Sequence, residues 1–404
     1  MGNPKQSVSW RKRVSRSKQL WLERKKLWQR SDRDFRDPAC VAGHSSDSDV
    51  DPRLLQQRVT GPFWDILKEL DLTFLVTREY EHLVLALSGS STERVSYLRL
   101  PHPSGLTVDV ARKRVYVAST RNPNQLFSLA PATSTKTRLD CDSIDLESQP
   151  LVPTRSVFLP GCLYMHDLAM IGGALHANAV GENAVVRIDD DGNVHRAWWP
   201  QCAELDDGPV FGQNHLQLNS IAAGRSIKSS YFSASTDVVS ARRPGHHNFP
   251  VDKCGVIFSG RTREVIARGL TRPHSTRLHN DRIWVDNSGY GEVGYIDAGH
   301  FHAVARLPGW TRGLCIRDNF LFVGTSHIIR RFEKYAPGLD ADKCACGVHV
   351  VDLSTGQVVA RIIWPFGYQI FSIEAAPASW TGGFPCRRRR AKAFEKNLFY
   401  TFKT

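Results

Sequence analysis

Six polar residues recur at matching places in a repeating pattern, each at the start of an apolar run. They are, in chain order, Ser104, His166, Asn219, His274, Arg312 and Gln369. Imidazoles that converge suit a divalent transition metal, and a single imidazole suits proton transfer near neutral pH. A guanidinium suits the bidentate binding of a carboxylate. These residue types therefore predict a polar site for a small anionic or sugar-like substrate.

The elements that must position these residues are short strands that come in pairs. His166 opens an apolar run that turns and continues as LHANAV, and Asn219 opens one that continues as YFSAST. Such pairs begin near residues 104, 164, 219, 274 and 312. A spacing of about 40 to 60 residues is typical of β-propeller blades whose loops carry insertions.

The number of blades follows from the two ends of the repeating region. The run GYQIFSIEAAP, from residue 367, has the pattern of one more inner strand, which makes six. The runs TFLVT and HLVLALS, which precede the first repeat, would complete that last blade. Joining the first and last strands in one blade closes the ring and leaves no exposed edge. We therefore predict an all-β, six-bladed propeller, with five or seven blades as the alternatives.

The opening residues of successive blades are expected to meet at one mouth of the propeller channel, because the innermost strand of each blade lines that channel. There His166, His274 and Arg312 are the predicted catalytic residues, with an imidazole as general base and Arg312 as anion clamp. The predicted substrate-binding residues are the amides Asn178, Asn219, Asn287 and Gln369.

One divalent metal ion is the cofactor that this set of residues predicts. Its ligands would be His166, His274 and His215, which lies four residues before Asn219 and could reach inward. The metal would act as a Lewis acid on a carbonyl or a carboxylate. No spacing motif such as HExxH accompanies these histidines, so the prediction rests on their convergence alone.

A site of this kind suits an enzyme of the lyase, epimerase or hydrolase type. The alternative is a non-catalytic propeller that binds a peptide or a glycan at the same mouth, because propellers serve both purposes. A third interpretation is structural, in which polar residues at blade openings bond to backbone and tie one blade to the next. The insertion at 241–255 is either a lid over the channel or a plain surface loop.

The positive charge of the chain is concentrated in its two flanks. The net charge is +13, of which residues 10–36 contribute +8, residues 386–404 contribute +6 and Lys5 contributes +1. The remainder, residues 37–385, therefore carries −2. A nearly neutral body argues against a nucleic-acid-binding face on the propeller. The basic flanks suit contact with an acidic partner or an anionic membrane surface.

The chain divides into a basic extension and linker at 1–55, a propeller at 56–385 and a basic tail at 386–404. In the extension, apolar residues recur at helical steps, which predicts an amphipathic helix that lies on a membrane, docks on a partner or packs on the protein's own body. These residues are Trp10, Val14, Leu20, Trp21, Leu27 and Trp28. The chain shows neither a secretory signal nor a long apolar span, and nine scattered cysteines favour reduced thiols, so we expect a cytoplasmic protein.

Several segments also carry a family resemblance. HDLAMIGGALHANAVGENAVVRID resembles an NHL-type repeat blade, and the blades together are similar to the six-bladed group that includes gluconolactonases and strictosidine-synthase-like proteins. More closely, PHSTRLHNDRIWVDNSGYGEVG, TRGLCIRDNFLFVGTSHIIRR and IWPFGYQIFSIE resemble an uncharacterised bacterial propeller family, a domain of unknown function, over roughly Pro62 to Pro377. The gluconolactonase likeness implies a divalent metal held by Glu, Asn and Asp at the mouth, whereas the ring here offers mainly His, Asn and Arg.

Overall fold

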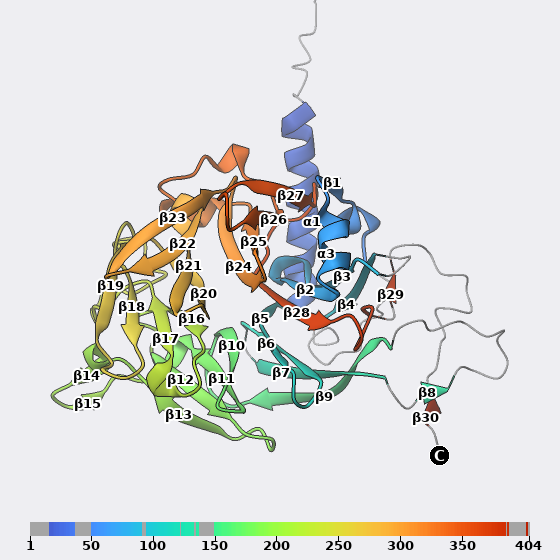
Figure 1. Ribbon diagram of the computed structural model, residues 1–404. Coiled ribbons are helices and arrows are strands. Elements are labelled where there is room, and N and C mark those ends of the chain that lie inside the picture. The colour runs from blue at the N-terminus through green and yellow to red at the C-terminus, as the bar shows by residue number, and fades with distance from the viewer. Residues whose placement is uncertain are drawn as a thin grey trace, which may run out of the picture.

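The chain forms a ring of six antiparallel sheets around a central channel (Figure 1). The computed structural model describes residues 16–36, 50–90, 94–121, 123–132, 135–136, 149–384, 386–387 and 401–402. The predicted all-β propeller with six blades is confirmed. Within the described residues, no helix has both the length and the apolar composition needed to cross a membrane.

Five blades are built from consecutive strands, with the innermost strand first. Blade 2 contains β5 (Pro103–Asp109), β6 (Arg114–Ser119), β7 (Asn124–Pro131) and β9 (Leu151–Leu159). Blade 3 contains β10 (Met165–Ile171), β11 (Ala174–Ala179), β12 (Ala184–Ile188) and β13 (Val194–Trp198). Blade 4 contains β16 (Leu218–Ala222), β17 (Tyr231–Ala234), β18 (Gly255–Ser259) and β19 (Val265–Leu270). Blade 5 contains β20 (Pro273–His279), β21 (Arg282–Asn287), β22 (Glu292–Asp297) and β23 (His300–Arg306).

Blade 6 contains β24 (Trp310–Arg317), β25 (Phe320–Ser326), β26 (Gly347–Asp352) and β27 (Val358–Ile363), and β1 (Arg58–Thr60) extends it at the outer edge. Two short strand pairs lie outside the blades, the hairpin of β14 (Glu204–Leu205) with β15 (Gly208–Pro209), and β8 (Thr135–Lys136) with β30 (Thr401–Phe402).

Blade 1 closes the ring with strands from both ends of the propeller. Its inner strand β28 (Ser372–Pro377) pairs with β2 (Leu72–Arg78), which is followed by β3 (Leu83–Ser88), β4 (Val95–Arg99) and β29 (Cys386–Arg387). The register sets Thr77 opposite Ser372 and Leu72 opposite Pro377. The predicted joining of the TFLVT and QIFSIEAA runs in one blade is therefore confirmed, and it removes the edge that an open ring would expose.

Apolar side chains fill the layers between neighbouring blades. Blades 6 and 1 share the largest cluster, in which Phe74 and Phe322 lie with their ring centroids 4.2 Å apart. A strand with both faces covered in this way has a continuous apolar sequence, because neither face meets solvent. The run HLVLALS, which contains β3, has this pattern. Helix α3 (Phe63–Glu69) adds Phe63 and Leu67 to the same cluster.

Five of the six inner strands carry a bulge near their first residue. The register shifts between Pro103 and Leu106 in β5 and between Met165 and Leu168 in β10, and corresponding shifts occur in β16, β20 and β24. A bulge takes a residue out of the ladder and redirects its side chain. The bulge thus takes the opening residues out of the regular in-and-out alternation of their strands and places them at the mouth of the channel.

A closed set of hydrogen bonds ties each blade to the next. In every case a side chain donates to a backbone carbonyl at the opening of the following blade. The six bonds, beginning at blade 1, are Thr77 to Ser104 (2.8 Å), Ser104 to Met165 (2.7 Å), Asn178 to Leu218 (2.7 Å), Asn219 to Pro273 (2.9 Å), Ser288 to Thr311 (2.6 Å) and Ser326 to Ile370 (3.1 Å).

Removal of one of these bonds should weaken the ring. We expect Ser326→Ala to lower the free energy of unfolding by about 1–3 kcal/mol, because it leaves the buried Ile370 carbonyl and N–H unsatisfied. Ser354→Ala, in the exposed turn after β26, is the matched control and should change it by less than about 0.5 kcal/mol. Urea unfolding measures the free energy of unfolding of both variants. An equally small decrease in the two would contradict a role for the Ser326 hydrogen bond.

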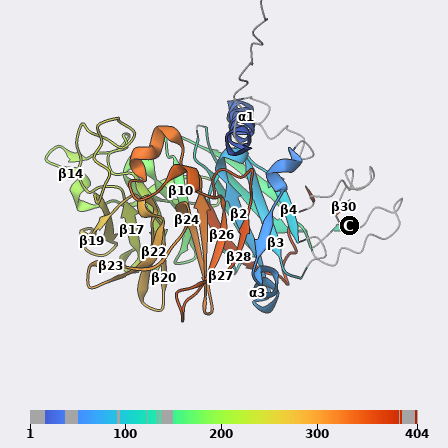
Figure 2. The same cartoon turned by 90° about the horizontal axis from the view of Figure 1, so that it is seen from above.

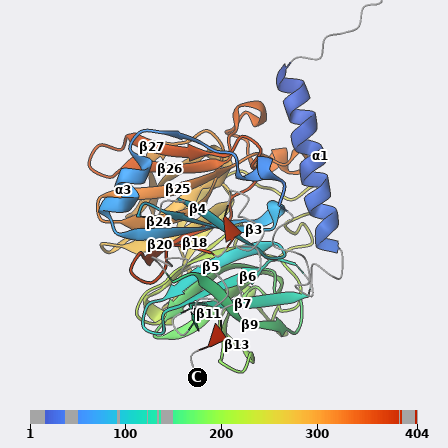
Figure 3. The same cartoon turned by 90° about the vertical axis from the view of Figure 1, so that its right-hand side faces the viewer.

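Helix α1 (Arg16–Arg36) lies on one face of the ring, and α3 lies on the opposite face (Figure 2). Figure 3 shows α1 running along that face. Leu27 is 5 % exposed and belongs to the core cluster of blades 6 and 1, while the Trp28 ring stacks on Tyr368 with centroids 3.7 Å apart. Of the three predicted locations for the helix, the structure shows packing on the protein's own body. Trp10 and Val14 lie outside the described residues.

Candidate functional site

The opening residues of blades 3, 5 and 6 lie together at the mouth of the channel on the α1 face. The His166 and His274 rings are nearly parallel, with centroids 6.2 Å apart, and Phe371 meets His166 edge-on at 5.3 Å. The Arg312 guanidinium donates from Nη2 to His274 Nε2 at 2.9 Å and lies 3.9 Å from the centre of the Phe371 ring. These three predicted catalytic residues are therefore brought together.

Gln369 extends this group towards blade 1. With its amide oriented to satisfy both neighbours, the nitrogen donates to Glu79 Oε2 at 2.9 Å and the oxygen accepts from Arg312 Nη1 at 2.7 Å. On the other side, Arg272 donates to Ser235 at 3.0 Å and lies over the Tyr335 ring at 4.7 Å. We call this set the mouth site, and its members are Glu79, His166, Arg272, His274, Arg312 and Gln369.

The predicted substrate-binding amides Asn178, Asn219 and Asn287 have structural partners instead. Asn178 and Asn219 donate to carbonyls of the next blade, as described above. Asn287 accepts from the backbone of Thr271 at 2.7 Å and donates to Glu292 at 2.9 Å. All three are buried, so a substrate would have to break these bonds to reach them. For Asn219, the one blade-opening residue of the three, this is the structural interpretation, and Asn178 and Asn287 make comparable structural contacts at the ends of second strands.

The predicted metal set of His166, His215 and His274 does not form, which corrects that prediction. His215 Nδ1 lies 3.1 Å from the Ser240 carbonyl, outside the mouth site. His274 Nδ1 lies 2.8 Å from the Arg272 carbonyl, and its Nε2 accepts from Arg312, so both ring nitrogens are engaged. Within the described residues, no group of three or more His, Cys, Asp or Glu side chains is arranged to hold a metal ion.

The donor set therefore does not fit a divalent cation. Two guanidinium groups, those of Arg312 and Arg272, already place positive charge at the mouth, and Glu79 is the one carboxylate that the mouth site contains. A metal would have to displace Arg312 from the His274 lone pair and overcome that repulsion.

Burial and charge keep both imidazoles of the mouth site neutral. Burial and the Arg312 cation lower the pKa of His166 to about 3 and hold the pKa of His274 well below its usual range. Burial also lowers the pKa of Arg312 to about 10, against the raising effect of Glu79. Burial alone would raise the pKa of Glu79, but His102, Arg121 and Arg312 outweigh it and lower that pKa. The mouth site therefore holds more positive than negative charge at pH 7.

The protonation of His166 is testable directly. We expect its ring to stay neutral from pH 8 down to about pH 4, because its pKa is lowered to about 3. An unfolded imidazole titrates near 6.5, so the stability that His166 contributes is present above about pH 6.5 and is lost as the pH falls towards 3. Carbon-detected NMR of the ring, assigned with His166→Gln, measures the midpoint. A midpoint between pH 6 and 7 would contradict a neutral, buried imidazole.

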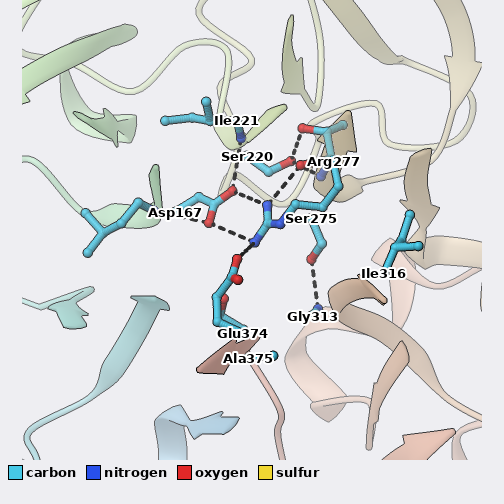
Figure 4. Close-up of polar contacts among 12 residues, drawn as sticks. Asp167, Ser220, Ile221, Ser275, Arg277, Gly313, Ile316, Glu374 and Ala375 are labelled. Atoms are coloured by element: carbon cyan, nitrogen blue, oxygen red, sulfur yellow. Dashed lines mark hydrogen bonds and ion pairs between the residues drawn. The ribbon is translucent and has the colours of Figure 1, made fainter. Parts of the chain in front are cut away.

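A second charged group lies across the channel next to the mouth site. Arg277 of blade 5 donates to Asp167 of blade 3 at 3.0 Å and lies 3.4 Å from Glu374 of blade 1 (Figure 4). These are alternate blades of the ring, so their side chains meet at the axis. Asp167 also accepts from the Ile221 backbone at 3.0 Å, and it orients no imidazole.

Burial is the largest single effect on the pKa values of these three axial groups. It raises the pKa of Asp167 and of Glu374, and the Arg277 cation opposes it in both. Burial alone would lower the pKa of Arg277, but the two carboxylates outweigh it and raise that pKa. Arg277 therefore remains charged, and the ion group connects three blades.

Sequence reasoning missed two members of the mouth site, Glu79 and Arg272. Arg272 stands two residues before His274 and has left-handed backbone, with φ 54°. His102, Tyr164 and Gln217 have the same conformation two residues before the opening residues of blades 2, 3 and 4. This repeated corner is a signal that could have pointed to Arg272. Glu79 directly follows β2, the second strand of its blade.

Two structural elements cover the mouth site. Trp28 of α1 stacks on Tyr368, the residue before Gln369, and Tyr368 meets Tyr80, the residue after Glu79, with centroids 5.6 Å apart. Phe249 and Val251, from the predicted lid or loop at 241–255, are buried in a cluster with Trp310 and Tyr335. Part of the insertion therefore packs against residues that contact the mouth site, while residues 245–248 are exposed.

The fold and the arrangement of strands define a six-bladed β-propeller with a polar, cationic mouth. The chain belongs to the family DUF4915, a domain of unknown function, which matches residues 61–381. The predicted membership of an uncharacterised propeller family is thus confirmed. A comparison with curated proteins gave no match.

Solved structures share the fold at low sequence identity. A chain of a nidogen/laminin complex is 10 % identical, with a TM-score of 0.51 over 76 % of this chain and 99 % of that chain. A protein of unknown function from Bacteroides caccae is 11 % identical, with a TM-score of 0.47 over 75 % and 98 %. A gluconolactonase from Xanthomonas campestris is 14 % identical, with a TM-score of 0.42 over 72 % and 84 %. These likenesses concern the fold alone.

Proposed function

We propose that the mouth site binds a small organic anion, such as a sugar acid, and catalyses its conversion by proton transfer, as a lyase, epimerase or hydrolase would. The observation that supports this proposal is the pair of buried guanidinium groups beside a neutral imidazole. Arg272 and Arg312 are 7 % and 5 % exposed, and within the described residues the Nε donor of each has no hydrogen-bond partner.

Two cations in one buried site favour an anionic ligand. Isolated charge in a poorly hydrated environment is costly, and a carboxylate that bridges two guanidinium groups offsets that cost with charge-assisted hydrogen bonds. Gln369 links the Arg312 guanidinium to the Glu79 carboxylate, whereas Arg272 contacts a hydroxyl group and an aromatic ring. One further negative charge would balance the site.

His166 is the proposed proton acceptor. Among the predicted site residues it is the one that remains partly exposed, and its Nδ1 is buried without a hydrogen-bond partner in the described part of the chain. Burial, Arg312 and Arg272 all lower its pKa, so a bound carboxylate that offsets the two cations would raise that pKa from about 3. Substrate binding would thereby convert a poor base into a useful one.

Access to the site requires movement of its cover. Of the two covering elements, the insertion at 241–255 is a better candidate for this movement than α1. Tyr335 accepts a hydrogen bond from the Gly245 backbone at 3.1 Å and also covers Arg272, so it links the insertion to the site. Opening of this loop would expose the guanidinium, and closing would exclude water from the bound anion.

The experiment compares binding and turnover in matched variants. Glucuronate is titrated into the full chain by calorimetry, with glucose as the neutral analogue, and conversion is followed by proton NMR. We expect wild type to bind glucuronate and not glucose, and His166→Gln to retain binding while losing conversion. Binding without conversion in wild type would overturn the enzymatic proposal in favour of the non-catalytic alternative, the binding of a peptide or glycan. Equal binding of the neutral sugar would overturn the anion site itself.

A further inference from the structure

A cleft lies between blades 2 and 3, far from the mouth site. Its volume is about 210 Å³, and it is bordered by the turns that connect β5 to β6 and β10 to β11. These turns are at the opposite ends of the inner strands from Ser104 and His166, so the cleft opens on the face away from α1. We call it the interblade cleft.

The floor of the interblade cleft is apolar. Leu126, Leu175 and Ile188 line it and are at most 7 % exposed, and all three belong to the cluster that packs blade 2 against blade 3. Tyr116, which is 8 % exposed, adds an aromatic ring to the lining. A floor of this composition favours an apolar group on the ligand.

Four arginines surround that floor. Arg112 pairs with Asp109 at 3.1 Å, and Arg155 donates to the Asp190 carbonyl. The side chains of Arg114 and Arg187, which also line the cleft, have neither a hydrogen bond nor an ion pair within the residues that the structure describes. Two guanidinium groups on neighbouring blades are therefore available to a ligand.

Acidic residues do not neutralise this rim. Asp189 and Asp190 line the cleft and Asp109 pairs with Arg112, so four positive charges face three negative ones. Asp189 is occupied by its own turn, where it accepts from Asn193 and from the Asp191 backbone, and the hydrogen bonds from Asn193 lower its pKa to about 2. The surplus of positive charge favours an oxyanion, which planar guanidinium groups bind bidentately.

We infer that the interblade cleft binds a small organic oxyanion with an apolar body, such as an aryl phosphate or aryl carboxylate. Size supports a ligand of this class: an apolar cavity of about 150 Å³ holds benzene, whereas drug-sized ligands occupy about 300–1,000 Å³. A cleft of about 210 Å³ therefore fits one ring with one anionic group. The ring would lie on the Leu126 and Leu175 side chains, and the oxyanion would bridge Arg114 and Arg187.

Phenyl phosphate is the probe that tests this inference, with phenol and inorganic phosphate as its two halves. We expect the full chain to bind phenyl phosphate at least about 10-fold more tightly than either half, because both the floor and the rim contribute. Arg114→Gln and Arg187→Gln should each weaken that binding by about 10-fold or more, the loss expected for a charge-assisted hydrogen bond.

The controls separate this cleft from general charge and from the mouth site. Arg361 on β27 is the match for Arg187 on β12, since each is exposed on an outer strand and lowers the pKa of a buried histidine on the adjacent strand. Arg361→Gln should leave phenyl phosphate binding unchanged, and Arg114→Gln and Arg187→Gln should leave glucuronate binding unchanged. The inference is overturned if wild type fails to bind phenyl phosphate, if Arg361→Gln weakens binding as much as Arg187→Gln, or if inorganic phosphate binds equally well.

Discussion

Replacing Arg277 with methionine is expected to lower the free energy of unfolding by about 3–5 kcal/mol, the usual cost of leaving a buried charge without its partner. Arg277 lies between Asp167 and Glu374, which are both largely buried. Methionine fills a similar volume but supplies no positive charge, so two carboxylates would face each other at the axis. Urea unfolding at pH 7 measures the effect.

The pH dependence of the Arg277→Met effect identifies its cause. Burial already raises the pKa of Asp167 and of Glu374, and removal of the cation raises both further. A carboxyl whose folded pKa lies above its unfolded value of about 4 destabilises the fold increasingly as the pH rises. The difference between variant and wild type should therefore be largest at pH 7 and shrink towards pH 4.5.

Two further variants serve as controls for this result. Arg282→Met, at the exposed start of β21 in the same blade, should cost less than about 1 kcal/mol. The triple variant Arg277→Met, Asp167→Asn and Glu374→Gln removes all three charges and should recover much of the loss. A deficit that is independent of pH and persists in the triple variant would mean that Arg277 acts by packing alone.

Replacing Arg312 with glutamine is expected to weaken glucuronate binding by about 10- to 150-fold, the range that corresponds to one charge-assisted hydrogen bond. A second consequence is independent of any ligand. Arg312 lowers the pKa of both His166 and His274, so its removal should raise the His166 midpoint above about 3. Calorimetry and NMR titration measure the two effects in the same protein.

Arg317→Gln is the matched control, because Arg317 lies on the same strand β24 but pairs with Glu374 at the axis. It should change neither glucuronate binding nor the His166 titration. Arg312→Lys is a sharper test, since lysine keeps the charge but lacks the fork that serves Gln369 and His274 together. If the lysine variant bound glucuronate as wild type does, charge alone would account for the site and the bidentate geometry would not.

The repeated strand pairs determined the architecture before any tertiary contact was known. Alternating apolar runs at blade spacing predict a propeller, and the position of TFLVT and QIFSIEAA at its two ends predicts how the ring closes. This inference succeeds because strand period and turn chemistry are local properties. The same repetition also placed His166, His274 and Arg312 at one mouth, since equivalent residues of a ring converge on its axis.

The roles of those residues depended on partners that lie in other blades. Asn219 and Arg312 occupy equivalent places in the repeat, yet Asn219 bonds to the backbone of the next blade while Arg312 contacts two side chains of the mouth site. Asp167, next to His166, pairs with Arg277, which is 110 residues away in the sequence. The local sequence pattern does not indicate which distant residues form such pairs.

The sequence by itself therefore determined the fold, the number of blades and the mouth at which polar residues gather. Only the tertiary structure decided that the amides join the blades, that Glu79 and Arg272 complete the mouth site, and that guanidinium groups rather than a metal supply its positive charge. The physical reason is one of range. Strand formation follows from neighbouring residues, whereas the protonation and hydrogen bonding of a buried side chain follow from the charges and donors that the fold brings within a few ångströms of it.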